Sequence, residues 1–138
     1  MKKLLTVLVL LSISSISSAS EWLYLFSSDT KKYYADLESF ERVNSYNENL
    51  IKAWFKLEIF NDIEKDGMGV GDETLVLYNF DCKNKKMGFT QVINYKKNKP
   101  LGNSYNASSA IMKDIIPDTI GAESLNRACS IYRIQNEG

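Results

Sequence analysis

The sequence predicts an α+β fold: a small antiparallel β-sheet of about five or six strands, with a C-terminal helix packed on it and tied to it by a disulfide. Apolar and polar residues alternate in Leu50–Phe60, which is the period of a strand with one buried and one wet face. Short strand-like segments joined by turns favour an antiparallel meander over βαβ units. A helix start precedes Ile120, and Cys82 and Cys129 are placed to join that helix to the sheet.

The expected elements follow one another closely along the chain. The strands are Trp22–Phe26, Lys31–Asp36, Leu50–Phe60, Thr74–Cys82 and Met87–Tyr95. The connections are a single turn at Leu37–Phe40, a glycine-rich acidic loop at Asn61–Asp72, and turns at Lys83–Lys85 and Lys96–Asn103. This series of strands and turns describes one sheet.

The C-terminal part changes character after Ser104. Ala110–Ile116 has the composition of a helical turn. Asp118 or Thr119 then offers a side-chain oxygen to the free N–H groups of a helix that begins at Ile120. We expect this helix to end at Cys129.

The two cysteines predict a disulfide. Both lie in the part of the chain that we expect to be exported, and an oxidising compartment converts an isolated pair into a disulfide more often than into a metal site. The residues are 47 positions apart, from Cys82 to Cys129. A loop of that length is worth roughly 4 kcal/mol in the chain-entropy model.

The first 19 residues predict a secretory signal peptide. Lys2 and Lys3 give a positive start, Leu4–Leu11 is apolar apart from one threonine, and Ala19 ends a stretch of small residues suited to cleavage. The apolar stretch is too short for a transmembrane segment, which needs about 20 residues. No cysteine for lipid attachment stands near the cleavage site. We therefore expect residues 20–138 to form a single unanchored domain in the periplasm, at the cell surface or secreted.

Composition excludes two classes of protein. The 138 residues are 44% hydrophobic, 12% aromatic and 25% charged, which is too apolar for intrinsic disorder. Lys and Arg number 17, as do Asp and Glu, so the formal net charge is zero. Because no global field and no nucleic-acid motif is present, we expect no nucleic-acid partner.

Catalysis has no positive support in the sequence. The absence of histidine removes the common nucleophile triads and most zinc sites. Clustered carboxylates suit calcium, but their spacing does not match an EF-hand, so a solvated acidic loop is favoured. These carboxylates are Asp62, Glu64, Asp66, Asp72 and Glu73. Nothing singles out one pair of them for glycosidase chemistry. We expect no catalytic residue, no metal and no cofactor.

Two surface features are candidates for recognition. Glu58–Asp81 holds seven acids and one lysine, whereas Lys83–Lys99 holds six lysines and no acid. If these two segments are neighbouring strands, their opposite charges either steer a protein partner or pair with each other. Trp54 falls on the polar face of its strand, as a binding anchor or packed under a loop. The candidate partner-binding residues are Trp54, Lys83, Lys85, Lys86, Lys96, Lys97 and Lys99.

A series of short motifs runs along the exported part. They are Trp22, Tyr33–Asp36, Ile51–Lys56, Asp81–Cys82, Tyr95, Ile116–Thr119, Leu125 and Cys129. Their order resembles the surface-adhesin protein E-like family of Gram-negative bacteria. The resemblance implies a small antiparallel sheet with a packed helix, and cell adhesion by capture of host extracellular-matrix or serum proteins, with plasminogen, vitronectin and laminin as the ligands to try first.

Two classes of function follow. The first is an exported non-enzymatic binding protein, either an adhesin or a soluble periplasmic protein with an unknown role in the envelope. The second is a small secreted hydrolase whose active site the sequence does not reveal. The lack of histidine and of an activated nucleophile favours the first class. The ligand, and whether the chain forms a homodimer through an edge strand, stay open.

Overall fold

The computed structural model describes residues 19–102 and 104–137. The long strands are β1 (Trp22–Ser27), β2 (Lys31–Asp36), β4 (Leu50–Ile59), β5 (Glu73–Asp81) and β6 (Lys86–Lys96). The short elements are η1 (Leu37–Ser39), β3 (Glu41–Arg42), β7 (Lys99–Pro100), β8 (Tyr105–Asn106) and β9 (Lys113–Asp114), and the helix is α1 (Ile120–Asn136). The predicted signal peptide, residues 1–19, lies outside the described residues apart from Ala19.

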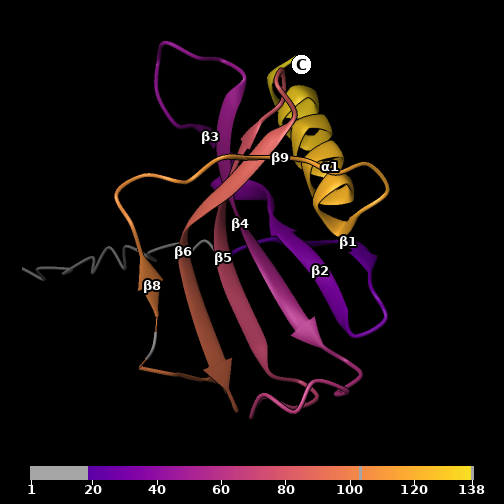
Figure 1. Cartoon of the computed structure of the whole chain (residues 1–138). Helices are drawn as coiled ribbons and strands as arrows, with labels where there is room; N and C mark the ends of the chain where they lie inside the picture. Colours follow the sequence, from indigo (N-terminus) through magenta and orange to yellow (C-terminus); the bar gives the residue numbers. More distant parts are fainter. Residues whose placement is uncertain (1–18, 103, 138) are drawn as a thin grey trace, which may run out of the picture.

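The strands form a single antiparallel sheet in the order β1-β2-β4-β5-β6 (Figure 1). The short strand β3 pairs with β4, and β7, β8 and β9 pair with successive parts of the outer edge of β6. The predicted fold class, an antiparallel sheet with one C-terminal helix tied by a disulfide, is confirmed.

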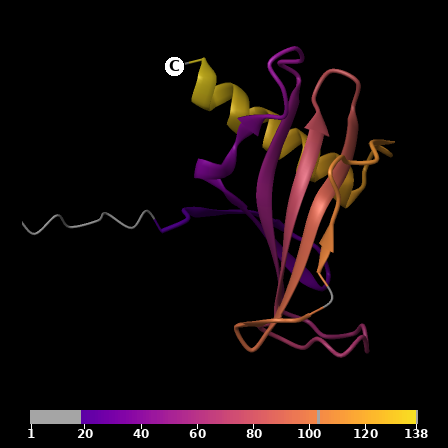
Figure 2. The same cartoon turned by 90° about the vertical axis from the view of Figure 1, so that its left-hand side faces the viewer.

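The alternation in β4 separates the two faces of the sheet. Ile51, Ala53 and Phe55 are completely buried and face α1, where Leu125 and Ala128 are also buried. The intervening residues of β4 lie on the opposite face, which α1 does not cover. Figure 2 shows the sheet from this second side, with α1 behind the strands. We call it the open face.

The helix is longer than predicted. Thr119 caps it, because its side chain accepts a hydrogen bond from the N–H of Ala122, but the helix runs to Asn136 and not to Cys129. The helix continues past Cys129 because no glycine or proline stands in residues 130–136, which the prediction overlooked. The last turns are also held by tertiary contacts: Gln135 donates a hydrogen bond to the carbonyl of Leu37.

Residues 107–116 are extended, and we call them the strap. The prediction of a helical turn at Ala110–Ile116 was wrong, because the backbone is satisfied by pairing with β6 instead: β9 pairs with its first residues, and the N–H of Ile115 donates to the carbonyl of Lys85. The strap, drawn in orange in Figure 1, crosses β6 and leads to α1. A Cβ atom on Gly88 would lie 2.5 Å from the Ile111 carbonyl oxygen, so only glycine permits this close approach.

The disulfide joins Cys82, directly after β5, to Cys129 in the middle of α1, as predicted. It closes over the apolar core and fixes the helix across the sheet. Among the described residues no helix is long and apolar enough to cross a membrane.

Candidate functional site

An apolar cleft of about 410 Å³ opens between the strap, the helix-side face of β5 and β6, and the first turn of α1. It forms beside the first turn of α1, where the helix no longer covers the sheet. Its walls are mainly aromatic and aliphatic. The lining includes Tyr33, Tyr78, Met87, Phe89, Tyr105 and Ile120.

The floor of the cleft is made by two tyrosines. Tyr33 is only 7% exposed, and Tyr78 packs edge-on against Phe55 with ring centroids 5.4 Å apart. Burial raises the pKa of Tyr78 to about 12 and also raises the pKa of Tyr33. Both phenols are therefore neutral at physiological pH, so the floor offers aromatic surface and hydroxyl groups and no general base.

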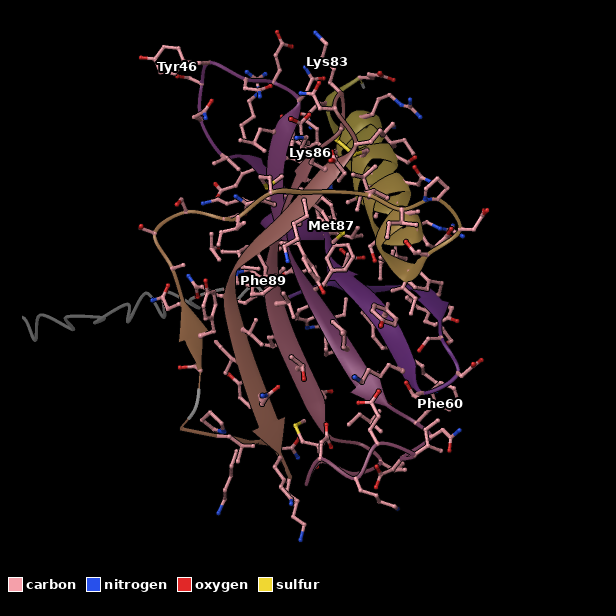
Figure 3. The ribbon with its side chains drawn as sticks, in the orientation of Figure 1. Tyr46, Phe60, Lys83, Lys86, Met87 and Phe89 are labelled. Carbon is pink, nitrogen blue, oxygen red and sulfur yellow. A yellow bond between two sulfur atoms is a disulfide. The ribbon has the colours of Figure 1, made fainter. Side chains whose placement is uncertain are left out.

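The rim of the cleft leaves large apolar side chains in water. Phe89 and Tyr105 are 44% and 45% exposed, and their rings meet edge to face with centroids 5.4 Å apart. Ile111 and Ile120 complete the rim at 75% and 44% exposure. Met87 and Phe89 point from β6 in Figure 3. Contiguous apolar surface of this kind, around a concavity, is typical of a binding site.

One ion pair lies beside the cleft. Asp114, in the lining, pairs with Lys86 at 3.5 Å, and Lys113 is the neighbouring cation. Both partners of the pair are largely exposed. The charge at this rim is therefore solvated and suited to steering a partner more than to chemistry.

Trp54 lies on the open face, in a hollow of about 430 Å³ beneath η1 and β3. Its side chain is half-buried, and its backbone N–H donates a hydrogen bond of 2.9 Å to the hydroxyl of Ser39. The sequence left two roles open for Trp54, a binding anchor or packing under a loop. Residues of η1 and β3 pack beside it, and the hollow keeps the residue accessible.

The six candidate lysines do not form one patch. Lys83, Lys85 and Lys86 lie at the end of β6 that is near the disulfide, and Figure 3 shows two of them at that end of the molecule. The other three lysines follow the far end of β6, which has 11 residues and so spans about 33 Å.

The far lysines contact the acidic loop. The Nζ of Lys96 donates a hydrogen bond to the carbonyl of Gly67, and the backbone N–H of Lys97 donates to Asp72 at 3.0 Å. Asp72 also accepts from the N–H of Gly69, and these backbone hydrogen bonds lower its pKa. At this end the lysine segment is held on the acidic loop by hydrogen bonds that involve backbone groups, and the charges of Lys96 and Lys97 further lower the pKa of Asp72.

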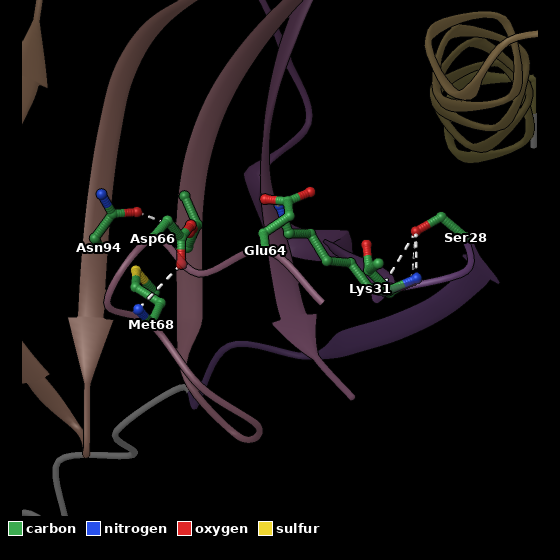
Figure 4. A network of polar contacts seen from close by, with 8 residues as sticks. Ser28, Lys31, Glu64, Asp66, Met68 and Asn94 are labelled. Atoms are coloured by element: carbon green, nitrogen blue, oxygen red, sulfur yellow. Dashed lines mark hydrogen bonds and ion pairs between the residues drawn. The ribbon is translucent and has the colours of Figure 1, made fainter. Parts of the chain in front are cut away.

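The other loop carboxylates are directed to different partners. Glu64 pairs with Lys31 at 3.7 Å, and Asp66 accepts a hydrogen bond from the N–H of Met68, as Figure 4 shows. The described residues contain no group of three or more carboxylates or cysteines arranged to hold a metal ion. These acids organise the loop.

Comparison with known proteins identifies the family. The family model described as surface-adhesin protein E matches residues 22–130, which extends from β1 through most of α1. The chain belongs to the surface-adhesin protein E family. The match includes every wall of the cleft.

A solved structure has the same fold. The structure of Haemophilus influenzae protein E matches with a TM-score of 0.54 and 14% sequence identity, over 83% of this chain and 87% of that one. No curated protein sequence matches the chain. The shared fold therefore accounts for the arrangement of sheet and helix, and the roles of individual residues rest on the site itself.

Sequence reasoning missed the cleft. Phe89 was placed in a strand, but Tyr105 joins it only because β8 returns to pair with β6, opposite Gln91 and Val92. A two-residue strand carries no periodic signal. The available clue was Tyr105, an aromatic residue in a segment to which the sequence analysis assigned no element.

Proposed function

We propose that this chain is an exported, non-enzymatic, adhesin-like protein that captures a host extracellular-matrix or serum protein, and that the cleft is its contact site. The observation that carries the proposal is the exposed rim of the cleft, above all the Phe89–Tyr105 pair. Aromatic residues around a pocket are the usual anchors of a protein interface. Family membership supports the class of function.

The chemistry of the cleft supports binding over catalysis. Its two buried phenols have raised pKa values, and its carboxylate, Asp114, is paired with Lys86 and exposed. A hydrolase needs an activated nucleophile or a base aimed at the reacting atom. The lining therefore favours the binding protein over the secreted hydrolase.

Removing the two rim rings tests the proposal. The double variant Phe89→Ser/Tyr105→Ser should weaken capture of plasminogen, vitronectin or laminin about tenfold or more, measured by surface plasmon resonance with the purified exported protein. Tyr46→Ser is the matched control, because Tyr46 is 96% exposed on a loop away from the cleft. Equal capture by the double variant and the wild type would remove the cleft from the proposal.

The candidate lysines are tested at the two ends of β6 separately. Replacement of three lysines by Gln, at Lys83, Lys85 and Lys86, should slow association with the partner, because this end of β6 adjoins the cleft through the Lys86–Asp114 pair. The effect should shrink in about 1 M salt, which screens the charges. The same replacements at Lys96, Lys97 and Lys99 change the charge equally and serve as the control. Equal slowing by both triple variants would mean that net charge, and not this end of β6, governs encounter.

The site of action is tested on intact cells. Adhesion requires exposure outside the outer membrane, so protease added to whole cells should degrade the protein. A protein that stays intact until the outer membrane is opened would support the periplasmic alternative and contradict an adhesin.

A further inference from the structure

The open face carries a second concavity, which we call the trough. It consists of two adjoining hollows of about 430 Å³ and 400 Å³ that share Lys52, Leu77 and Gln91 in their linings. Trp54 lines the first hollow, and Asn79 lines the second. The strap, at residues 107–110, forms a wall of the second hollow. The trough is on the opposite side of the sheet from the core.

Asn79 is the unusual residue in the trough. Its side chain is only 6% exposed, yet no hydrogen-bond donor among the described residues reaches its buried Oδ1 atom. An unsatisfied buried polar atom lowers the stability of the fold, so most proteins avoid one. Rotation of the amide exchanges its oxygen and nitrogen, so the group can present either an acceptor or a donor.

The strap lies next to Asn79 in the lining of the second hollow. Asn79 lies opposite Gly88 in the β5–β6 pairing, so both residues face the same side of the sheet. The carbonyl of Ile111 and the side chain of Ala110 lie directly above Gly88, at 2.5 Å and 3.2 Å from the position of a Cβ atom. The strap therefore lies over Gly88, beside Asn79, and supplies no hydrogen bond to the Asn79 Oδ1.

The second hollow, around Asn79, has a mainly neutral polar lining, in which Lys52 is the charged residue. Lys52 forms an ion pair of 3.0 Å with Glu41. The neutral polar residues in the lining are Asn79, Thr90, Gln91, Ser108 and Ser109. Amides and hydroxyls each donate and accept hydrogen bonds. The trough therefore suits a neutral ligand that is itself both donor and acceptor.

We propose that the trough binds a neutral saccharide that carries N-acetyl groups. A sugar ring has hydroxyl groups that both donate and accept, and an apolar face that packs on an aromatic side chain such as that of Trp54. An acetamido group adds one N–H, which can donate to the unpartnered Oδ1 of Asn79, and one C=O, which can accept from an amide or hydroxyl group of the lining. The assignment goes beyond the capture of proteins by the cleft and uses none of the cleft residues named for it.

The test is a calorimetric titration of the purified exported protein with chitotriose, the β-1,4-linked trimer of N-acetylglucosamine. We expect a dissociation constant of about 1 mM or lower. Cellotriose, which has hydroxyls in place of the acetamido groups, should bind about tenfold more weakly. Absence of chitotriose binding at millimolar concentration, or equal binding of both sugars, would overturn the proposal.

Matched variants locate the site. Asn79→Leu should abolish chitotriose binding, and Gln91→Ala, a milder change in the same lining, should weaken it. Asn94→Leu is the control, because the Asn94 Oδ1 is already satisfied by the hydroxyl of Thr74 at 2.7 Å and lies outside the trough. Binding that survives in both trough variants, or is lost equally in the control, would contradict the site. The Phe89→Ser/Tyr105→Ser variant should keep full chitotriose binding, so failure of the cleft proposal stays distinguishable.

Discussion

Phe80 and Asn79 are neighbours in β5 that point to opposite faces of the same sheet. Phe80 is completely buried beneath α1, with its ring 5.4 Å from that of Phe55. Asn79 is almost as buried, but its amide oxygen has no hydrogen-bond partner among the described residues. Burial alone therefore does not distinguish a residue that stabilises the fold from one that costs stability.

The difference extends to the two faces. Apolar side chains that pack against one another fill the helix-covered face, and the disulfide holds α1 on this face. The open face holds a trough in which the Asn79 amide oxygen is unsatisfied, and the cleft leaves the rings of Phe89 and Tyr105 exposed beside α1. Proteins tolerate such local costs mainly where they bind something. We infer that the covered face specifies the fold and that its margin and the open face carry recognition.

The largest effect should come from the covered face. Phe80→Ala removes a ring packed among Phe55, Tyr78 and Met87, and should lower the free energy of unfolding by about 3 to 5 kcal/mol. Urea denaturation followed by circular dichroism measures it. A loss below about 1 kcal/mol would mean that the core does not depend on this contact and would erase the contrast with Asn79.

The disulfide should come next. Cys82→Ser should lower the free energy of unfolding by roughly 2 to 5 kcal/mol, because the bond to Cys129 closes a long loop and holds α1 on the sheet. Cys129→Ser should have the same effect, since each variant breaks the same bond. Two variants with unequal stabilities would show that a cysteine side chain contributes beyond the bond.

The strap offers a smaller test, because it borders both concavities. Gly88→Ala places a Cβ atom 2.5 Å from the Ile111 carbonyl oxygen and should cost about 1 to 3 kcal/mol as the strap moves away. Gly102→Ala is the control, since nothing lies within 4 Å of its Cβ position. If Gly88→Ala matched this control in stability, the strap would not be held against β6.

The smallest effect should depend on pH. Backbone hydrogen bonds from Gly69 and Lys97 lower the pKa of Asp72 in the folded protein. Its contribution is therefore fully present above its unfolded pKa of about 4, and is lost as the pH falls through the lower folded value. Asp72→Asn should destabilise the protein at neutral pH, and the difference from wild type should shrink below about pH 4. A difference that is constant with pH would exclude the carboxylate charge as its cause.

Much of the fold follows from local sequence signals. The alternation in β4, the turns around Lys83–Lys85 and the cap before α1 act over a few residues, so the strands, their order along the chain and the start of the helix were predictable. The helix end and the strap were not. Both depend on contacts distant in sequence, such as that of Gln135 with Leu37 and the pairing of β9 with β6.

The candidate sites were less accessible to sequence reasoning than the fold. Trp54 was found because it breaks the polar pattern of its strand. The lysines were grouped by proximity in sequence, yet an 11-residue strand separates them into two ends. Asn79 looks like any polar residue of an alternating strand, and only the three-dimensional structure reveals that its amide oxygen is buried without a partner.

The most direct test of the contrast between the faces is the unfolding free energy of Asn79→Leu, measured by urea denaturation beside the wild type. Leucine has a similar volume and no unsatisfied oxygen, so we expect the variant to be as stable as the wild type or more stable, by up to about 1 to 3 kcal/mol. A loss of more than about 1 kcal/mol would contradict the account, because it would show that the Asn79 amide stabilises the fold.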